Sequence, residues 1–130
     1  MSKKAIRIAA PYSKCSQERL RVIAKSIEKI DAEGIEGDIV ECGVWKGGVV
    51  ILARLLSPNR KVWLYDTFNG MANLSEFDTT KDGYVMPEGK AAVSQYEVAR
   101  NLAETYTLHH DRIRFVEGRV EDTLLDRNNL

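Results

Sequence analysis

Residues 38–48 read DIVECGVWKGG, and the apolar run VVILARLL follows them at 49–56. A short segment rich in strand-forming residues therefore leads into a glycine-rich turn and then into a segment of helical length. Strand, glycine turn and helix in this order open the ligand-binding unit of parallel α/β folds. The stretch predicts an α/β fold that holds a ligand at the turn.

The glycine spacing narrows the class of ligand. A dinucleotide fingerprint reads G-x-G-x-x-G, and its middle glycine lets the backbone approach a pyrophosphate. Trp45 stands at that middle position here, and the acidic Glu41, two residues before Gly43, would repel phosphate. An NAD-dependent oxidoreductase is therefore disfavoured.

A zwitterionic ligand suits the same stretch better. Glu41 can accept an ammonium group, and the backbone amides that open the following helix, at the positive end of its dipole, can bind a carboxylate. S-adenosylmethionine carries both groups on its methionine end. The alternative is that Gly43, Gly47 and Gly48 only form a tight turn and that Glu41 is solvated.

Five segments of the chain together resemble the macrocin (TylF-type) O-methyltransferases. They are SQERL at 16–20, GDIVECGVWKGG at 37–48, VWLYDTFNGM at 62–71, RFVEG at 114–118 and VEDTL at 120–124. The resemblance implies a Rossmann-like class I methyltransferase fold. It also implies methyl transfer from S-adenosylmethionine to a hydroxyl, commonly on a sugar or glycosylated small molecule, with a divalent metal. Because the region before the first strand helps to cover the cofactor in this family, Tyr12 and Ser13 become candidate contacts.

The second predicted strand, 61–65, ends in Asp66. An acidic residue about 20 positions after the glycine turn is where α/β nucleotide folds bind a ribose hydroxyl. Asp66, with Thr67 beside it, is therefore predicted to contact the ribose. A helix-capping or surface carboxylate is the alternative.

Beyond the third predicted strand, 113–117, the resemblance places residues 118–122 at the adenine pocket. Glu121 or Asp122 could accept from the adenine amino group; acids that merely favour a helix N-terminus are the alternative. The complete predicted cofactor set is Glu41, Gly43, Val44, Trp45, Gly47, Gly48, Asp66, Thr67, Gly118, Arg119, Val120, Glu121 and Asp122.

We expect a single partial methyltransferase domain over residues 1–130. A helical cover at 1–36, with an amphipathic helix at 16–33, precedes three strand–helix units at 37–130. The strands should be parallel, in the order 3-2-1, with flanking helices. Residues 68–90 are predicted to form a lid-like loop, and a helix at 91–107 is predicted to bury Tyr96 and Tyr106.

Composition excludes several classes of function. Lys plus Arg and Asp plus Glu both number 19, so no net charge favours nucleic acid or an anionic membrane. The longest apolar run falls short of the ~20 residues of a membrane span, and no signal peptide is evident. We therefore expect a cytoplasmic protein. Cys15 and Cys42 are too isolated for a disulfide framework or zinc site, and Cys42 is predicted to be buried. His109 and His110 lack neighbouring ligands, so no metal residue is predicted.

The sequence contains no fourth strand to lie beside the first at the ligand crevice. In the resembling family the metal ligands and the base that deprotonates the acceptor lie further along the chain. No catalytic residue is assigned here, and Mg²⁺ is expected only in a completed domain.

Two hypotheses of different classes remain. The first is the cofactor-binding half of an O-methyltransferase, completed in a homo-oligomer or by a complementing C-terminal polypeptide. The second is a truncated, non-catalytic module that binds S-adenosylmethionine or a nucleoside and needs a partner chain. In both, the strand at 39–42 is an open edge that should pair with another chain.

Overall fold

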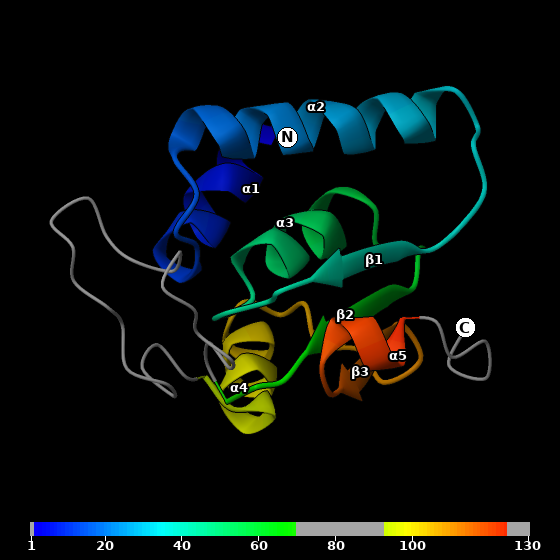
Figure 1. The fold of residues 1–130 in the computed structure, drawn as a ribbon. Coiled ribbons are helices and arrows are strands. Elements are labelled where there is room, and N and C mark those ends of the chain that lie inside the picture. Colours follow the sequence, from blue (N-terminus) through cyan, green and yellow to red (C-terminus); the bar gives the residue numbers. More distant parts are fainter. Residues whose placement is uncertain (1, 70–92, 125–130) are drawn as a thin grey trace, which may run out of the picture.

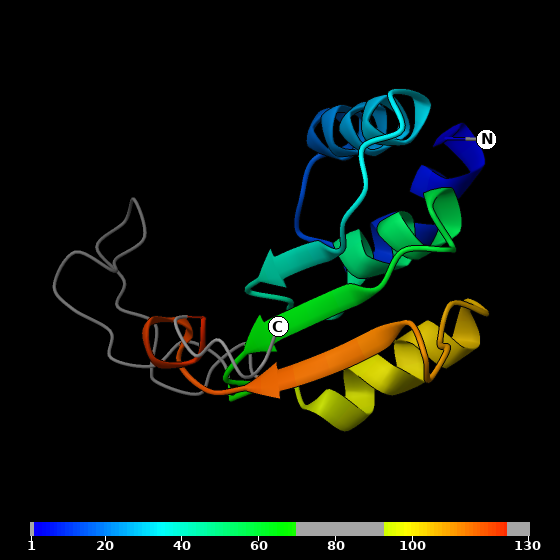
Figure 2. The same cartoon turned by 90° about the vertical axis from the view of Figure 1, so that its right-hand side faces the viewer.

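The structure is a computed structural model that describes residues 2–69 and 93–124. Its strands are β1 (Ile39–Cys42), β2 (Val62–Asp66) and β3 (Ile113–Glu117), which form a parallel sheet in the order β1-β2-β3. This is the predicted order 3-2-1 read from the other edge, so the predicted arrangement of strands is confirmed. All three arrows point the same way in Figure 2, and the turns that follow the strands therefore gather at one end of the sheet.

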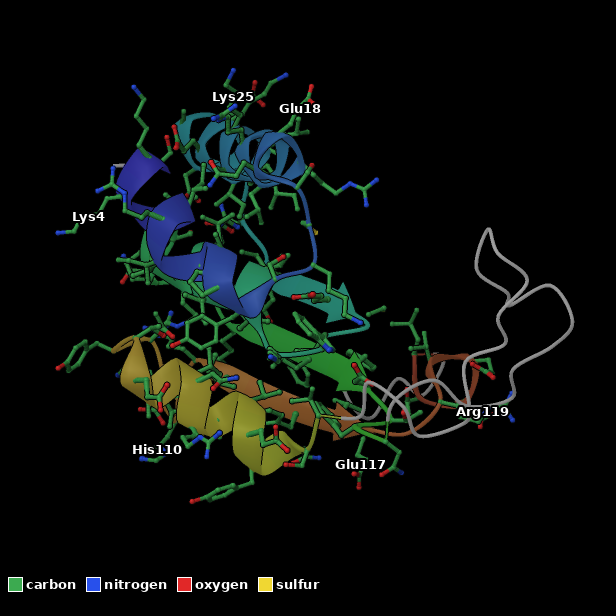
Figure 3. All side chains as sticks on the ribbon, turned by 90° about the vertical axis from the view of Figure 1, so that its left-hand side faces the viewer. Lys4, Glu18, Lys25, His110, Glu117 and Arg119 are labelled. Carbon is green, nitrogen blue, oxygen red and sulfur yellow. The ribbon has the colours of Figure 1, made fainter. Side chains whose placement is uncertain are left out.

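Six helical segments accompany the sheet. They are α1 (Ser2–Ala9), the 3-10 turn η1 (Ala10–Tyr12), α2 (Gln17–Ala32), α3 (Gly48–Leu56), α4 (Gln95–Glu104) and α5 (Val120–Thr123) among the described residues. Both α1 and α2 pack against α3, which lies between α2 and the sheet in Figure 1. In Figure 3, α1 (blue) and α4 (yellow) lie in front of the strands. The large helices thus cover one face of the sheet.

The core lies between that face and the helices. Val62 and Leu64 of β2 are fully buried, as are Val50 and Ile51 of α3. Helix α3 is apolar almost all round because it meets the sheet on one side and the N-terminal helices on the other. The glycine turn that precedes α3 is consequently anchored on a rigid element.

Helix α2 matches the helix predicted at 16–33. The Ser16 hydroxyl oxygen accepts a hydrogen bond from the Arg19 amide and caps the first turn. The predicted stripe is buried at Leu20, Ala24 and Ile27. Gly34 follows the helix with a φ of 67°, the left-handed conformation that ends helices.

The prediction for the face of α4 is wrong. Tyr96 is 75 % exposed and Tyr106, which lies beyond the end of the helix, is 97 % exposed. Val98 and Leu102 are buried instead, one turn apart along the helix. The predicted lid at 68–90 lies, from residue 70 onward, outside the described residues.

Strand β1 is more open than predicted. Val40 is 44 % exposed and Cys42 is also exposed, so the expected burial of Cys42 is wrong. Both residues alternate with the helix-facing Ile39 and Glu41 and therefore point to the other face of the sheet. Figure 2 looks onto that face, with α3 and α4 behind the strands.

The outer edge of β1 follows from its hydrogen bonds. The amides of Ile39 and Gly43 donate to Lys61 and Tyr65 across the pair with β2. Because backbone groups alternate in direction along a strand, those of Val40 and Cys42 point away from β2. Within the described ranges, β1 pairs with β2 alone.

None of the helices described is long and apolar enough to traverse a bilayer.

Candidate functional site

Three turns meet at the carboxyl ends of the strands. They follow β1 at 43–47, β2 at 67–69 and β3 at 118–119, and the short α5 lies beyond the arrowheads in Figure 2. Every residue of the predicted cofactor set lies in these turns or directly beside them. The carboxyl end of a parallel sheet is where α/β folds bind ligands.

Asp66 joins the three turns. Its Oδ2 accepts a hydrogen bond of 2.6 Å from the amide of Val44, and its Oδ1 accepts one of 3.0 Å from the amide of Phe68. Its backbone carbonyl accepts a third bond, of 2.9 Å, from the amide of Gly118. Asp66 therefore fixes the turns relative to one another, whichever ligand they bind.

Glu41 carries the least satisfied group of the site. Its Oε2 is buried and has no hydrogen-bond partner within the part of the chain that the structure describes. Burial, together with the nearby charge of Asp66, raises the pKa of the Glu41 carboxyl to about 8. A buried acceptor without a donor is unfavourable unless a ligand supplies one. An ammonium group is the donor that would relieve both the missing hydrogen bond and the unfavourable charge.

The glycine turn is held from two sides by close packing. A Cβ on Gly48 would lie 2.6 Å from the Cβ of Ser13 and 2.8 Å from the carbonyl oxygen of Tyr12, so only glycine fits there. Gly47 precedes α3 with a φ of 96°, a conformation that side chains rarely adopt. Tyr12 and Ser13 thus cover the start of α3, in agreement with their assignment to the covering region.

Trp45 occupies the middle of the turn in an unusual backbone conformation. Its φ is 52°, which is uncommon for a residue with a side chain and is often found at functional sites. The ammonium nitrogens of Lys14 and Lys46 lie 4.6 and 4.7 Å from the centroid of its ring. Cation–π attraction of this kind attaches the linker before α2 to the turn.

Asn101 supports the turn from α4, a role that the sequence did not reveal. Its side-chain nitrogen donates a hydrogen bond of 3.0 Å to the carbonyl oxygen of Lys46, and the residue is buried. The one available signal was a polar residue beside the apolar positions Val98 and Leu102. A buried amide in such a stripe indicates a specific hydrogen-bond partner.

The predicted adenine residues are placed less tightly. Glu121 and Asp122 are exposed in the first turn of α5, and Glu121 forms an ion pair with Arg119. A backbone hydrogen bond is the main cause that lowers the pKa of Glu121. Val120 begins α5, and the Thr67 hydroxyl accepts from the amide of Asn69. Gly118, which opens this segment, joins it to the end of β2 through its bond to the Asp66 carbonyl oxygen.

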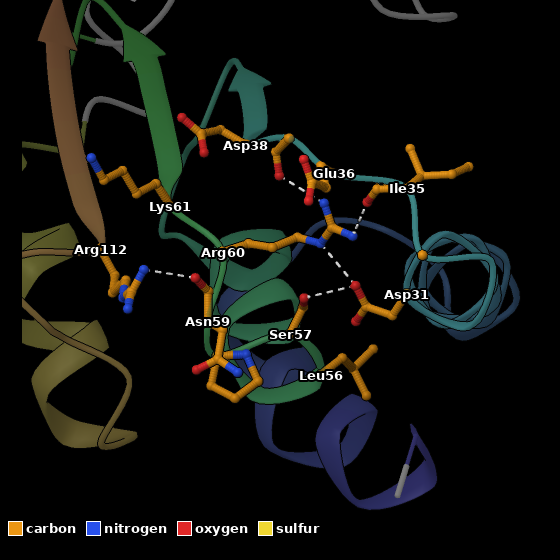
Figure 4. A pocket seen from close by; sticks show the side chains of 13 residues that line it. Asp31, Ile35, Glu36, Asp38, Leu56, Ser57, Asn59, Arg60, Lys61 and Arg112 are labelled. Carbon is orange, nitrogen blue, oxygen red and sulfur yellow. Dashed lines mark hydrogen bonds and ion pairs between the residues drawn. The ribbon is translucent and has the colours of Figure 1, made fainter.

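A cleft of about 610 Å³ opens at the opposite end of the sheet, beside the amino ends of the strands. Figure 4 shows the Arg60 guanidinium at its centre, bound to Asp31 at 2.8 Å and to the carbonyl oxygens of Ile35 and Gly37. The Ser57 hydroxyl donates to the same carboxylate oxygen of Asp31. These contacts join the loops before β1 and β2, which is a structural role. Nowhere in the described ranges do three or more His, Cys, Asp or Glu side chains gather as a metal site.

Residues 7–129 match the sequence pattern of the macrocin-O-methyltransferase (TylF) family. The chain belongs to the TylF family. Membership in this methyltransferase family implies S-adenosylmethionine as the methyl donor, and it confirms the resemblance noted from the sequence.

The chain is similar to several proteins named as O-methyltransferases. The chain is 35% identical over 120 residues to demethyldecarbamoylnovobiocin O-methyltransferase of Streptomyces niveus. The match covers 82% of this chain and 44% of that protein. It is 34% identical over 115 residues to 8-demethyl-8-(2,3-dimethoxy-alpha-L-rhamnosyl)-tetracenomycin-C 4'-O-methyltransferase of Streptomyces olivaceus, with coverage of 82% and 44%. This TylF-family chain therefore spans about half the length of the curated relatives it matches.

The fold agrees with a solved structure. The O-methyltransferase NovP matches 89% of this chain with a TM-score of 0.76 and 31% sequence identity, and the match covers 51% of NovP. Together with the three parallel strands, this likeness confirms the predicted methyltransferase fold.

Proposed function

We propose that this TylF-family chain binds S-adenosylmethionine at the carboxyl ends of its strands and forms the cofactor-binding half of an O-methyltransferase. The observation that carries the proposal is the buried Oε2 of Glu41 at the end of β1, which has no hydrogen-bond partner among the described residues. The methionine ammonium group is a donor of the right charge for this oxygen. When bound, S-adenosylmethionine supplies an electrophilic methyl group on a positively charged sulfur.

The remaining residues of the set would orient the cofactor. The amides at the start of α3 would bind the methionine carboxylate, since a helix N-terminus favours an anion. Asp66 would contact the ribose with the lone pairs that its two backbone hydrogen bonds leave free, with Thr67 beside it. Residues 118–122 would line the adenine. Trp45 and Ser13 would exclude water from the methionine end.

The proposed acceptor is a hydroxyl of a sugar or glycosylated small molecule. One relative that supports this proposal is the 4'-O-methyltransferase named above, whose substrate bears a rhamnosyl group. A second is mycinamicin III 3''-O-methyltransferase of Micromonospora griseorubida, which is 30% identical over 123 residues. The base that deprotonates the acceptor and the Mg²⁺ that the resemblance implies are assigned to a completed domain.

Completion of the domain would occur at the β1 edge. Val40 and Cys42 are exposed, and their backbone groups point away from β2. An unpaired edge of this kind readily accepts another strand. We propose that a second copy or a complementing C-terminal polypeptide supplies that strand.

Calorimetric titration with S-adenosylhomocysteine tests the binding proposal. A charge-assisted hydrogen bond contributes about 1.5–3 kcal/mol, so Glu41→Gln should weaken binding about tenfold or more. Glu117→Gln makes the same change at the exposed end of β3 and serves as the matched control, with unchanged affinity expected. Equal affinities for all three proteins would remove Glu41 from the site.

A further inference from the structure

Asp66 is held in a fixed position by the backbone. Each of its carboxylate oxygens accepts a hydrogen bond from a main-chain amide, one from Val44 and one from Phe68. The end of β2 therefore holds the Asp66 carboxylate close to a second acidic side chain, on β1.

That side chain is Glu41, and its surroundings disfavour a second negative charge. Its Oε2 is buried and has no hydrogen-bond donor among the described residues. Burial raises the pKa of Glu41 most, and the nearby Asp66 carboxylate raises it further. Of the other charged groups that the structure describes at this end, Arg119 and Glu121 pair with each other and Asp122 is exposed. Lys14 and Lys46 lie against the ring of Trp45, and Glu117, at the end of β3, is exposed. The pKa of about 8 that follows for Glu41 leaves it about nine-tenths protonated at pH 7.

We propose that Asp66 is a positioning residue that locks the turns after β1 and β2 together and adds to the effect of burial in holding Glu41 neutral until a cationic ligand group arrives, so that cofactor binding releases a proton. This inference rests on the proposed function, because it assumes that Glu41 receives the methionine ammonium. It adds to that function a coupling between the charge of the ligand and the protonation of Glu41. The site then favours ligands that carry an ammonium group, since only these replace the proton of Glu41.

The proton balance of the binding step is simple. The O–H bond of the neutral Glu41 carboxyl breaks and its proton passes to the buffer. The resulting carboxylate accepts an N–H donated by the ligand ammonium, so the negative charge that appears on Glu41 is paired with the positive charge of that group. A ligand without an ammonium group, such as 5′-methylthioadenosine, leaves the proton on Glu41.

The test counts protons by calorimetry of S-adenosylhomocysteine binding at pH 7 in buffers of different ionisation enthalpy. Glu41→Gln reports the ligand's own proton exchange, and its value is subtracted. The wild-type chain should then release about 0.9 proton per site, as expected from a pKa of about 8. Asp66→Asn, which removes the charge but leaves Glu41 buried, should release measurably fewer protons than the wild type. Asp66→Glu keeps the charge but displaces the hydrogen bonds, so it should keep the proton release while it loses affinity.

The outcomes separate this inference from the proposed function. If the wild-type chain binds S-adenosylhomocysteine but Asp66→Asn releases as many protons as the wild type, the role of Asp66 is overturned and the proposed function stands. If the wild-type chain does not bind the probe, the proposed function fails.

A carboxyl carbon NMR titration of the empty wild-type chain gives a readout that needs no variant. Glu41 should titrate near pH 8. A titration in which Glu41 loses its proton near the ordinary value of 4.5 would overturn the inference, whether or not the Asp66 variants fold.

Discussion

The carboxylate of Asp66 accepts a hydrogen bond of 2.6 Å from the amide of Val44, which lies 22 positions earlier in the chain. This bond joins the end of β2 to the glycine turn after β1, and a second bond to the amide of Phe68 extends the link to the next turn. The Asp66 carboxylate therefore binds the protein's own backbone at the centre of the site. Because these bonds fix its position, it lies close enough to raise the pKa of Glu41, the proposed ammonium acceptor.

Loss of the Asp66 carboxylate should destabilise the fold. Asp66→Ala leaves the amides of Val44 and Phe68 without their acceptor, and an unsatisfied buried group costs about 1–3 kcal/mol. Urea denaturation of the variant measures the change in the free energy of unfolding. Asp122→Ala, at an exposed acid of α5, is the control and should stay within about 0.5 kcal/mol. A stability for Asp66→Ala as close to wild type as that of the control would show that the turns do not depend on it.

Stability should fall with rising pH because of Glu41. Its folded-state pKa of about 8 lies above the ordinary value of 4.5, so between these values the folded chain binds more protons than the unfolded chain. The free energy of unfolding begins to fall as the pH rises past 4.5, falls by up to ~1.4 kcal/mol per pH unit, and stops falling above about pH 8. Glu41→Gln should lack this component. Thermal melts of both proteins at pH 6 and pH 9 measure it, and parallel pH profiles would contradict the raised pKa.

Gly48 should not tolerate a side chain. In Gly48→Ala the new Cβ would meet Ser13 at 2.6 Å and the carbonyl oxygen of Tyr12 at 2.8 Å. Overpacking of this kind costs about 1–3 kcal/mol. Adding Ser13→Gly should restore part of the stability, since it removes the nearest of the three clashing atoms, the Ser13 Cβ. A double variant no more stable than Gly48→Ala would place the strain elsewhere.

The β1 edge should drive self-association of the isolated chain. Val40→Lys places a charge on the exposed strand, which is how natural edge strands avoid pairing. Light scattering after size-exclusion chromatography should show a higher monomer fraction for this variant than for the wild type. Val22→Lys, at a 60 % exposed position of α2, is the matched control and should leave the oligomer unchanged. A wild-type chain that elutes as a monodisperse monomer contradicts the prediction.

Local patterns in the sequence predicted much of the fold. The strand, turn and helix around residues 38–56 and the capped helix after Ser16 follow from short-range spacing, and the structure has both. Such patterns fail where burial depends on distant neighbours. Tyr96 lies near the apolar spacing of its helix, yet α4 turns Val98 and Leu102 toward the core. Cys42 is exposed because no described element covers its face of β1.

In the candidate site, too, the sequence predicted the local features and missed the contacts between distant segments. The sequence indicated Glu41, Asp66 and the glycines by type and spacing, because strand ends and turns are local features. The hydrogen bond from Val44 to Asp66 and that from Asn101 to Lys46 join segments far apart in the chain, and no periodicity reports them. The burial of the Glu41 Oε2 is likewise not indicated by any local spacing.

The most direct test of the account compares two ligands with and without the Glu41 charge. S-adenosylhomocysteine carries the zwitterionic methionine-type end, and 5′-methylthioadenosine lacks it. We predict that Glu41→Gln weakens binding of S-adenosylhomocysteine about tenfold or more and leaves the affinity for 5′-methylthioadenosine unchanged, as measured by calorimetry at pH 7. Equal losses for both ligands, or no loss for either, would contradict the assignment of Glu41 as the ammonium acceptor.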